Sequence, residues 1–389
     1  MSTKVVVLGA GYAGAGAIPR LEEELGSDAE LTWVSDTDYH FVLHESHRII
    51  RDESVKNKIS IPVHDIKSPS TEFVQGEVVD VDTDEREVVL DGDRTVDYDY
   101  VLVALGSDTA FYGIDGMAEN ALTLKNRDDA VQIHNEVQQA AQEATREDPA
   151  QVVIGGAGLS GIQSAGEVAE FRDKHNAPIE VYLVEALETI FPPGDAEIQG
   201  TLRHHLEKAD VNILTNDPIV EATEEEIKFD ERDPLGYDVF LWAGGVTGPD
   251  ALEDVEVENQ HNRLEVGQDF QTEDERVFCI GDSAVIDQPG EHPAPPTAQA
   301  AWQAADVVGE NIANAIQGRP LKRWTYEDHG TLISVGETAI AHEVEIAGMD
   351  LPVRTFNSAP AKVLKKGAAA RWIAKITDWQ RAFDAWDVL

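Results

Sequence analysis

The sequence predicts an α/β protein that carries the same unit twice: a hydrophobic strand, a glycine-rich turn, a helix and a second strand. The first observation behind this is the match of VVVLGAGYAG (5–14) with VVIGGAGLSG (152–161). The second is a matching pair further along, YDYVLVALG (98–106) and YDVFLWAGG (237–245). Because strands joined by a helix lie parallel with right-handed crossovers, we expect two parallel sheets, each with its glycine turn at the carboxyl edge.

The remaining elements follow in chain order. Each glycine turn leads through a helix to a further strand, LTWVS (31–35) in the first copy and VYLVE (181–185) in the second. The segment 72–93 alternates valine with acidic residues, which predicts antiparallel strands that cover one face. A helical pattern over 130–148 stops before Pro149 and leads into the second copy.

Domain boundaries follow from these matches. We expect the first unit to comprise residues 1–112 and, after an interruption, 248–322. The second unit fills the interruption at 113–247, and residues 323–389 form a small C-terminal region.

Composition excludes several classes of function. The chain has 389 residues with 74 Asp and Glu against 30 Lys and Arg, a net charge of −44 that disfavours nucleic-acid binding. Such an acidic surface predicts adaptation to high salt, as in a halophile. Molar salt shortens the Debye length to about 3 Å, so the acidic side chains no longer repel one another strongly. Cys279 is the single cysteine, which excludes disulfide frameworks, cysteine-bound iron–sulfur clusters and two-cysteine redox shuttles. No apolar run approaches the roughly 18 residues of a membrane span, so we expect a cytoplasmic protein, at most peripheral to the inner face of the membrane.

Both glycine turns fit the GxGxxG pattern of dinucleotide-binding sites. In that pattern the first glycine makes the tight turn, the second lets the backbone approach a pyrophosphate, and the third lets helix and strand pack closely. The helix N-terminus adds free N–H groups and partial positive charge for the diphosphate. Neither turn ends in the Lys-Ser/Thr of a P-loop, so nucleotide hydrolysis is not expected.

Three acidic positions refine this picture. Glu185 ends the strand after the second turn, where a carboxylate can accept both ribose hydroxyls and repel a 2′-phosphate, which favours NADH over NADPH. The equivalent position in the first copy is Ser35, with Asp36 beside it, and either of the two can hold the ribose. Asp282 ends the strand-like VFCIGD (277–282), and a helix expected to begin near Pro296 or Thr297 points its dipole at a bound ring system.

With these residues assembled, the chain resembles the two-dinucleotide flavoprotein oxidoreductases, and most closely the type II NADH:quinone dehydrogenases. The resemblance implies two Rossmann-like dinucleotide-binding domains in a glutathione-reductase-like fold. It is carried by GAGYAG (9–14), Tyr39-His40, ALG (104–106), GGAGLSG (155–161), VEA (184–186), WAGGV (242–246), IGD (280–282) and AQAAWQ (298–303). The last of these matches the family's quinone-site pattern, Ala-Gln-x-Ala-x-Gln.

The resemblance also implies cofactors and site residues. FAD is expected on Gly9, Gly11, Gly14, Ser35, Asp36, His40, Ala104, Gly106, Gly281, Asp282 and Ala298. NADH is expected on Gly156, Gly158, Gly161, Glu185, Gly244 and Gly245. Gln299 and Gln303 are expected at the quinone site, with menaquinone as the expected quinone, and Gln163 near the nicotinamide. NADH would pass a hydride to FAD, and the quinone would then take two electrons.

The sequence departs from the family pattern in two places. Gln163 stands where the family usually has Glu, and the long apolar C-terminal segment of the family is shorter here. Sulfide:quinone oxidoreductases and disulfide reductases share the architecture but need a cysteine pair, so Cys279 alone disfavours them. A soluble reductase that serves a protein acceptor such as ferredoxin, and a flavin-bearing sensor with little turnover, stay open as alternatives.

Two further patterns allow more than one interpretation. His40, His44 and His47 would share a helix face and imitate a metal site, but we favour packing or flavin contact and expect no metal. Near the C-terminus five apolar side chains recur at helical spacing in a basic segment: Trp372, Ile376, Trp379, Phe383 and Trp386. This stripe predicts either a helix docked on its own body or on a second subunit, or an in-plane membrane anchor.

Overall fold

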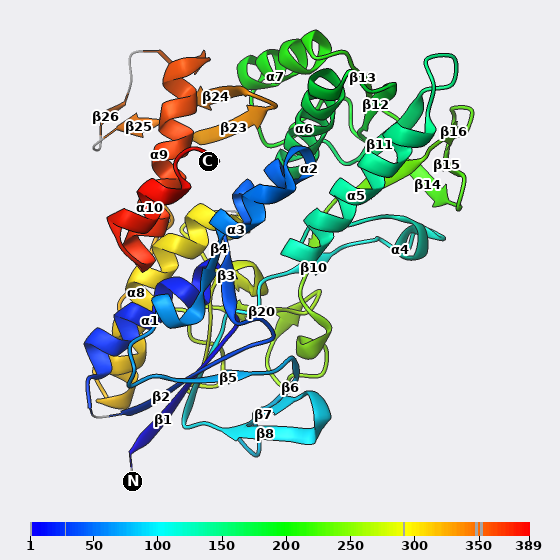
Figure 1. Ribbon diagram of the computed structural model, residues 1–389. Coiled ribbons are helices and arrows are strands. Elements are labelled where there is room, and N and C mark those ends of the chain that lie inside the picture. Colours follow the sequence, from blue (N-terminus) through cyan, green and yellow to red (C-terminus); the bar gives the residue numbers. More distant parts are fainter. Residues whose placement is uncertain (1, 28, 291, 347–348, 351–352) are drawn as a thin grey trace.

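Two parallel sheets form the centre of the molecule (Figure 1). The structure is a computed structural model that describes residues 2–27, 29–290, 292–346, 349–350 and 353–389. The first sheet has the order β21 (Val277–Cys279), β9 (Tyr100–Val103), β1 (Thr3–Leu8), β2 (Ala29–Ser35), β5 (Glu72–Gln75). The second has the order β13 (Val211–Leu214), β12 (Ile179–Val184), β11 (Ala150–Gly155), β17 (Val239–Trp242).

The register of the two sheets reproduces the sequence repeat. β1 lies between β2 and β9, and β11 lies between β12 and β17, with every pair parallel. Val5 is opposite Leu31 and Tyr100, while Val152 is opposite Val181 and Val239. These strands are buried on both faces, as their nearly continuous valine, leucine and isoleucine runs require.

Smaller sheets and ribbons surround the two centres. Their strands are β3 (Tyr39–Phe41) with β4 (Ser60–Pro62), β6 (Val78–Asp82) with β7 (Glu87–Leu90) and β8 (Arg94–Asp97), β10 (Asp108–Thr109) with β18 (Val246–Thr247), β14 (Ile219–Ala222) with β15 (Glu226–Phe229) and β16 (Leu235–Gly236), β19 (Asn259–Gln260) with β20 (Arg263–Val266) and β22 (Ala284–Ile286), and β25 (Glu345–Ile346) with β26 (Met349–Asp350). The antiparallel prediction for 72–93 holds for β6 and β7. It is wrong for β5, which extends the first parallel sheet and packs Phe73 against Trp33.

The helices of the two units are α1 (Tyr12–Leu25), α2 (Arg48–Arg51), α3 (Lys56–Ile59), α4 (Met117–Asn120), α5 (Arg127–Glu143), α6 (Leu159–His175), α7 (Ala196–Lys208) and α8 (Ala298–Ile316). α1 and α8 lie side by side across the first sheet (Figure 1). The helix expected over 130–148 is α5, which begins earlier because Asn126 and Asp129 form a capping box, and which ends at Glu143. β10 pairs with β18, so the two segments that connect the first unit with the second, near residues 112 and 247, lie next to each other. The domain boundaries themselves stay a prediction.

The C-terminal region corrects the prediction of one continuous apolar stripe. Its strands β23 (Thr331–Val335), β24 (Thr338–His342) and β27 (Thr355–Asn357) are followed by α9 (Ala359–Ile376) and α10 (Trp379–Ala385). The chain breaks between the helices because Asp378 caps α10, its Oδ1 accepting the Arg381 N–H at 3.0 Å. Trp372 is therefore fully buried, whereas Trp379 and Phe383 are 61% and 69% exposed. No helix in the described part of the chain is long and apolar enough to cross a membrane.

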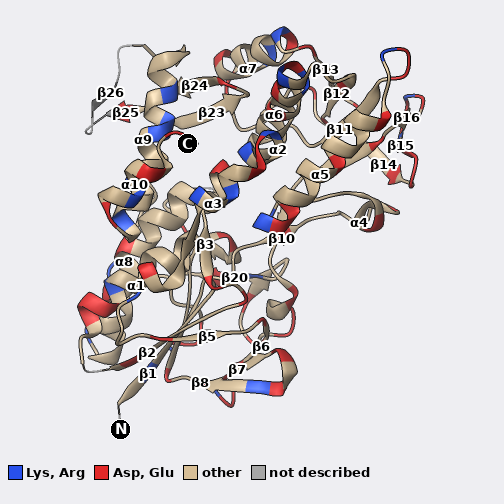
Figure 2. Ribbon diagram, in the orientation of Figure 1, with Lys and Arg blue, Asp and Glu red and all other residues tan. Residues whose placement is uncertain are grey.

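The charges are unevenly placed. Figure 2 shows Asp and Glu over the outer elements of both units, while Lys and Arg gather on α2 and α9. The basic residues of α9 are Lys362, Lys365, Lys366, Arg371 and Lys375. Positive charge thus concentrates where the C-terminal region meets the rest of an otherwise acidic molecule.

Candidate active site

One cavity of about 2140 Å³ lies where the carboxyl ends of both parallel sheets meet the C-terminal region. Both glycine turns line it, as do the start of α8 and one side of α9. Residues expected to hold two different dinucleotides, more than 140 positions apart in the chain, therefore face a common space.

The first turn has the geometry that a dinucleotide needs. Gly9 has φ +99°, and a Cβ there would lie 2.3 Å from the Ala104 carbonyl oxygen. A Cβ on Gly14 would lie 2.0 Å from the Gly9 carbonyl oxygen, so the helix packs on the turn as closely as expected. Gly11 faces open space in the cavity at the N-terminus of α1. These glycines leave room for a pyrophosphate beside free helix N–H groups.

The second turn repeats this arrangement. Gly156 has φ +93° and would place a Cβ 2.7 Å from the Gly244 Cα, and a Cβ on Gly161 would meet the Gly156 carbonyl oxygen at 1.8 Å. Gly158 again faces open space at the start of α6. Gly244 and Gly245 line the cavity beside this turn.

The acidic positions differ between the copies. Glu185 is 9% exposed, and its carboxylate accepts the N–H groups of Ala157 at 2.9 Å and Leu187 at 3.0 Å. Ser35 is buried and donates its hydroxyl hydrogen to Asp36 at 3.1 Å, while Asp36 is exposed. All three line the cavity. In the first copy the accessible carboxylate is therefore that of Asp36.

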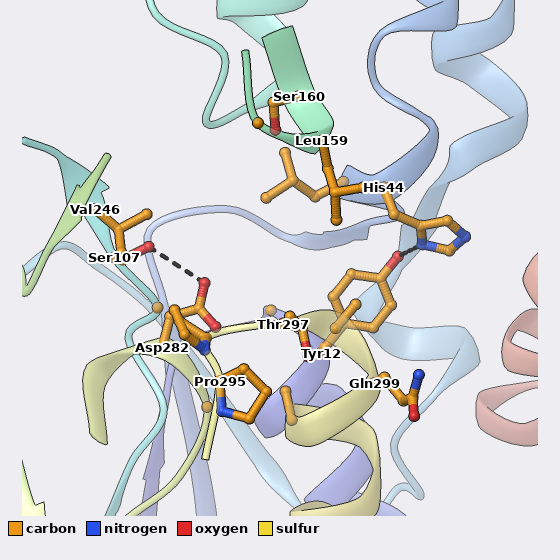
Figure 3. A pocket seen from close by; sticks show the side chains of 18 of the residues that line it. Tyr12, His44, Ser107, Leu159, Ser160, Val246, Asp282, Pro295, Thr297 and Gln299 are labelled. Carbon is orange, nitrogen blue, oxygen red and sulfur yellow. Dashed lines mark hydrogen bonds between the residues drawn. The ribbon is translucent and has the colours of Figure 1, made fainter. Parts of the chain in front are cut away.

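Asp282 belongs to a polar chain on the cavity wall (Figure 3). Its Oδ2 accepts the Ser107 hydroxyl at 3.3 Å, and Ser107 in turn accepts a hydrogen from Lys125 Nζ at 3.1 Å. Burial raises the pKa of Asp282, and Lys125 and Arg263 oppose that shift. Ala104, Gly106 and Gly281 line the same stretch. Lys125 was not singled out by sequence, because nothing local shows that it reaches across to the first unit.

The N-terminus of α8 lies where expected. Thr297 caps the helix by accepting the Ala300 N–H at 3.2 Å, so the helix begins at Ala298. Gln299 and Gln303 line the cavity, but their amides also bind backbone: Gln299 Oε1 accepts the His329 N–H at 2.8 Å, and Gln303 Nε2 donates to the Glu327 carbonyl at 2.7 Å. The two glutamines thus hold the segment 327–330 against α8.

Gln163 and the three histidines take separate roles. Gln163 lines the cavity, and its Oε1 accepts the Ser334 hydroxyl at 3.3 Å. His40 lies behind the cavity wall: it is fully buried between the Ala10 carbonyl and the indole N–H of Trp372. His44, on the short helix η1 (Leu43–Glu45), lines the cavity instead. Among the described residues no group of three or more His, Cys, Asp or Glu side chains could hold a metal ion.

A buried ionic cluster that sequence reasoning missed joins the three regions of the chain. Glu45 and Glu167 are fully buried, and Arg48 and Lys365 are 4% exposed. Glu45 binds Arg48 Nε and also Lys365 Nζ, the latter at 2.6 Å. Glu167 lies 3.1 Å from Arg51 Nε, yet neither of its oxygens has a hydrogen-bond partner. Burial raises the pKa of Glu167 to about 7, against the opposing charges of Arg51 and Arg48.

Comparison with known proteins identifies the family. The family model described as pyridine nucleotide-disulphide oxidoreductase matches residues 3–305. The type II NADH:quinone oxidoreductase of Staphylococcus haemolyticus is 30% identical over 353 residues, 86% of this chain and 87% of that protein. The protein of the same name from Staphylococcus saprophyticus is 29% identical over 352 residues, with the same two coverages. This chain belongs to the type II NADH:quinone oxidoreductases. The predicted family is thereby confirmed.

Solved structures confirm the fold of this family member. NDH2 from Plasmodium falciparum, in complex with NADH, matches with a TM-score of 0.82 and 16% identity, covering 100% of this chain and 98% of that one. The sulfide:quinone oxidoreductase of Aquifex aeolicus matches with a TM-score of 0.79 and 18% identity, covering 96% and 91%. The predicted fold of two dinucleotide-binding domains agrees with both. Cys279 is buried on β21, so a reactive cysteine pair is absent here.

Proposed function

We propose that the protein is an FAD-dependent NADH dehydrogenase that passes two electrons from NADH through FAD to a membrane quinone. The observation that carries this is the shared cavity onto which both glycine turns and the N-terminus of α8 open. FAD supplies the redox chemistry, since it accepts a hydride from NADH and releases electrons to a quinone. The chain binds and orients the reactants.

The residues of the cavity fit these roles. Gly11 and Gly158 leave space for the two pyrophosphates, and the hydrogen-bonded Ser107 and Lys125 hold Asp282 in place for a ribitol hydroxyl. The partial positive charge at the start of α8 stabilises negative charge on the reduced ring system. Asp36 takes the FAD ribose. We retain Glu185 for the NADH ribose and Gln163, which belongs to α6, for the nicotinamide end.

The quinone would enter between α9 and α8. Val363, Leu364, Gly367, Arg371 and Trp386 line this end of the cavity. The guanidinium of Arg371 and the ammonium of Lys375 lie over the Trp302 ring, 5.7 and 5.3 Å from its centroid. Aromatic and cationic side chains together suit the headgroup region of a bilayer.

Membrane attachment would rest on the exposed Trp379 and Phe383 of α10, next to this entrance. Trp379→Ser/Phe383→Ser should lower binding to lipid vesicles, measured by sedimentation, and leave reduction of a water-soluble quinone within about twofold. Val220→Ser, which removes another exposed apolar side chain in the second unit, is the control. If the double variant instead turns a homodimer into a monomer and binds vesicles as before, α10 is a subunit interface.

The acceptor is tested by steady-state NADH oxidation with a menaquinone analogue and, in parallel, with ferredoxin. We expect turnover with the quinone and none with ferredoxin. Turnover with ferredoxin alone would show a soluble reductase for a protein acceptor, and a bound flavin without turnover would show a sensor. Either result would refute the proposal.

A further inference from the structure

Reduction of a quinone consumes a proton as well as electrons. NADH, a quinone and one proton give NAD⁺ and a quinol. The hydride brings two electrons and one of the two added hydrogens, and the second hydrogen arrives as a proton from water. A cavity walled by protein needs a group that delivers this proton, and none of the residues assigned above does so.

Tyr12 and His44 form a hydrogen-bonded pair on the cavity wall, joined through Tyr12 Oη and His44 Nδ1 (Figure 3). Tyr12 directly follows Gly11 as the first residue of α1. Its ring is held by Trp372 and His40, with centroid distances of 4.9 and 5.1 Å. Figure 3 shows the ring on the same side of the cavity as Gln299 and Thr297.

We propose that Tyr12 donates the proton to the quinone oxygen and that His44 returns a proton to Tyr12. The O–H bond of Tyr12 breaks as the new O–H bond of the quinol forms, and the hydrogen on His44 Nδ1 moves to Tyr12 Oη. A proton from water binds His44 Nε2 as the Nδ1 hydrogen leaves, so the imidazole never becomes an anion; 31% of this side chain is exposed. The inference rests on the proposed function, since it needs a quinone in this cavity.

The surroundings of the pair suit a relay. Burial lowers the pKa of His44 to about 4, with Glu45 opposing and Lys365 and Arg48 adding to the shift, so the ring is neutral at pH 7 and passes protons without storing charge. Burial raises the pKa of Tyr12 well above its usual value, and Glu45 adds to this, so Tyr12 stays protonated until a stronger base arrives. His44 Nε2 lies 3.6 Å from Glu45 Oε1, which stabilises positive charge that passes through the ring. His40 faces the same phenol, and its pKa is also lowered by burial to about 4, so it remains neutral.

The experiment uses the flavin-loaded protein with two acceptors. Protein prereduced with one equivalent of NADH is mixed rapidly with a quinone, which needs protons, or with ferricyanide, which accepts electrons only. Because general acid catalysis contributes typically about 10²- to 10⁴-fold, Tyr12→Phe should slow reoxidation by the quinone about 100-fold or more. Reoxidation by ferricyanide, flavin content and reduction by NADH should stay within about twofold. His44→Gln, which keeps a hydrogen-bonding side chain but cannot pass a proton, should slow the quinone reaction, and the solvent deuterium isotope effect should persist because the Tyr12 O–H bond still breaks.

Tyr98→Phe serves as the control. Tyr98 is a buried tyrosine of the same unit that donates to the Asp82 carbonyl and does not line the cavity. Equal slowing with both acceptors in Tyr12→Phe would show that Tyr12 only holds the flavin, and an unchanged quinone rate would show that another group supplies the proton. Either result overturns the inference while the proposed function stands. Wild-type protein that reduces ferricyanide but no quinone would refute the proposed function, and this inference with it.

Discussion

The pair of Glu45 and Lys365 should stabilise the attachment of α9 to the first unit. Lys365 Nζ lies 2.6 Å from Glu45 Oε1, with 4% and 0% of the two side chains exposed. Lys365→Met keeps the length of the side chain and removes its charge. Loss of one partner from a buried pair costs about 3–5 kcal/mol. Because Arg48 still binds Glu45, we expect a loss near the lower end, about 3 kcal/mol in the free energy of unfolding.

The assay is urea unfolding followed by tryptophan fluorescence at constant high salt, with Lys322→Met as the matched control. Lys322 lies 2.5 Å from Glu310, but 57% and 33% of those side chains are exposed, so that pair should contribute under about 1 kcal/mol. Glu45→Gln/Lys365→Met should not recover the loss caused by Lys365→Met, because the buried Arg48 guanidinium then loses its carboxylate partner. Equal losses in Lys365→Met and Lys322→Met would refute the reasoning from burial.

The same pair predicts a pH dependence. Burial alone would raise the pKa of Glu45, but Lys365 and Arg48 hold it well below its usual range. A carboxyl whose pKa is lower in the folded state contributes stability that is complete above its unfolded pKa, about 4.5, and is lost as the pH falls through the folded value. The difference between wild type and Lys365→Met should therefore be constant above about pH 5 and shrink in acid.

Four further predictions concern binding, specificity and stability. Asp282→Ala should lower the flavin content of the purified protein severalfold, by absorbance, with little change in far-UV circular dichroism; full flavin content would refute its role. Glu185→Gln should reduce the preference in kcat/KM for NADH over NADPH by about 5- to 150-fold, corresponding to about 1–3 kcal/mol, at the lowest salt that keeps the protein folded; an unchanged ratio would contradict the assignment. The raised pKa of Glu167, about 7, means that wild type loses stability as the pH rises from about 4.5 to 7, and Glu167→Gln should flatten that slope. With a net charge of −44 the protein should unfold at a lower temperature as the salt concentration falls from about 2 M to 0.1 M. A melting temperature that does not change with salt would contradict the predicted adaptation to high salt.

The sequence predicted the features that occur twice in the chain or that depend on neighbouring residues alone. Glycines at three fixed spacings in each copy were enough to place both turns, because tight turns and close helix packing admit little else at Gly9 and Gly14. The edge strand β5 was missed because its alternating pattern is shared by antiparallel strands. The apolar stripe was misjudged because spacing alone does not show that Asp378 starts a new helix.

Contacts between residues far apart in the chain could not be predicted from local sequence patterns. Lys365 meets Glu45 across 320 positions, and Lys125 reaches Ser107 between two units. Neither lysine differs locally from a solvent-exposed lysine. The position of His40 behind the cavity wall likewise depends on Trp372, a residue from the far end of the chain whose indole N–H donates to His40.

Anaerobic titration of the flavin tests the central claim most directly. The two glycine turns facing one cavity predict one FAD per chain, whose absorbance near 450 nm is bleached by one equivalent of NADH and restored by one equivalent of a menaquinone analogue. An absorbance that NADH leaves unchanged, or that returns with oxygen or ferricyanide but not with the quinone, would contradict transfer from NADH through FAD to a quinone in this cavity.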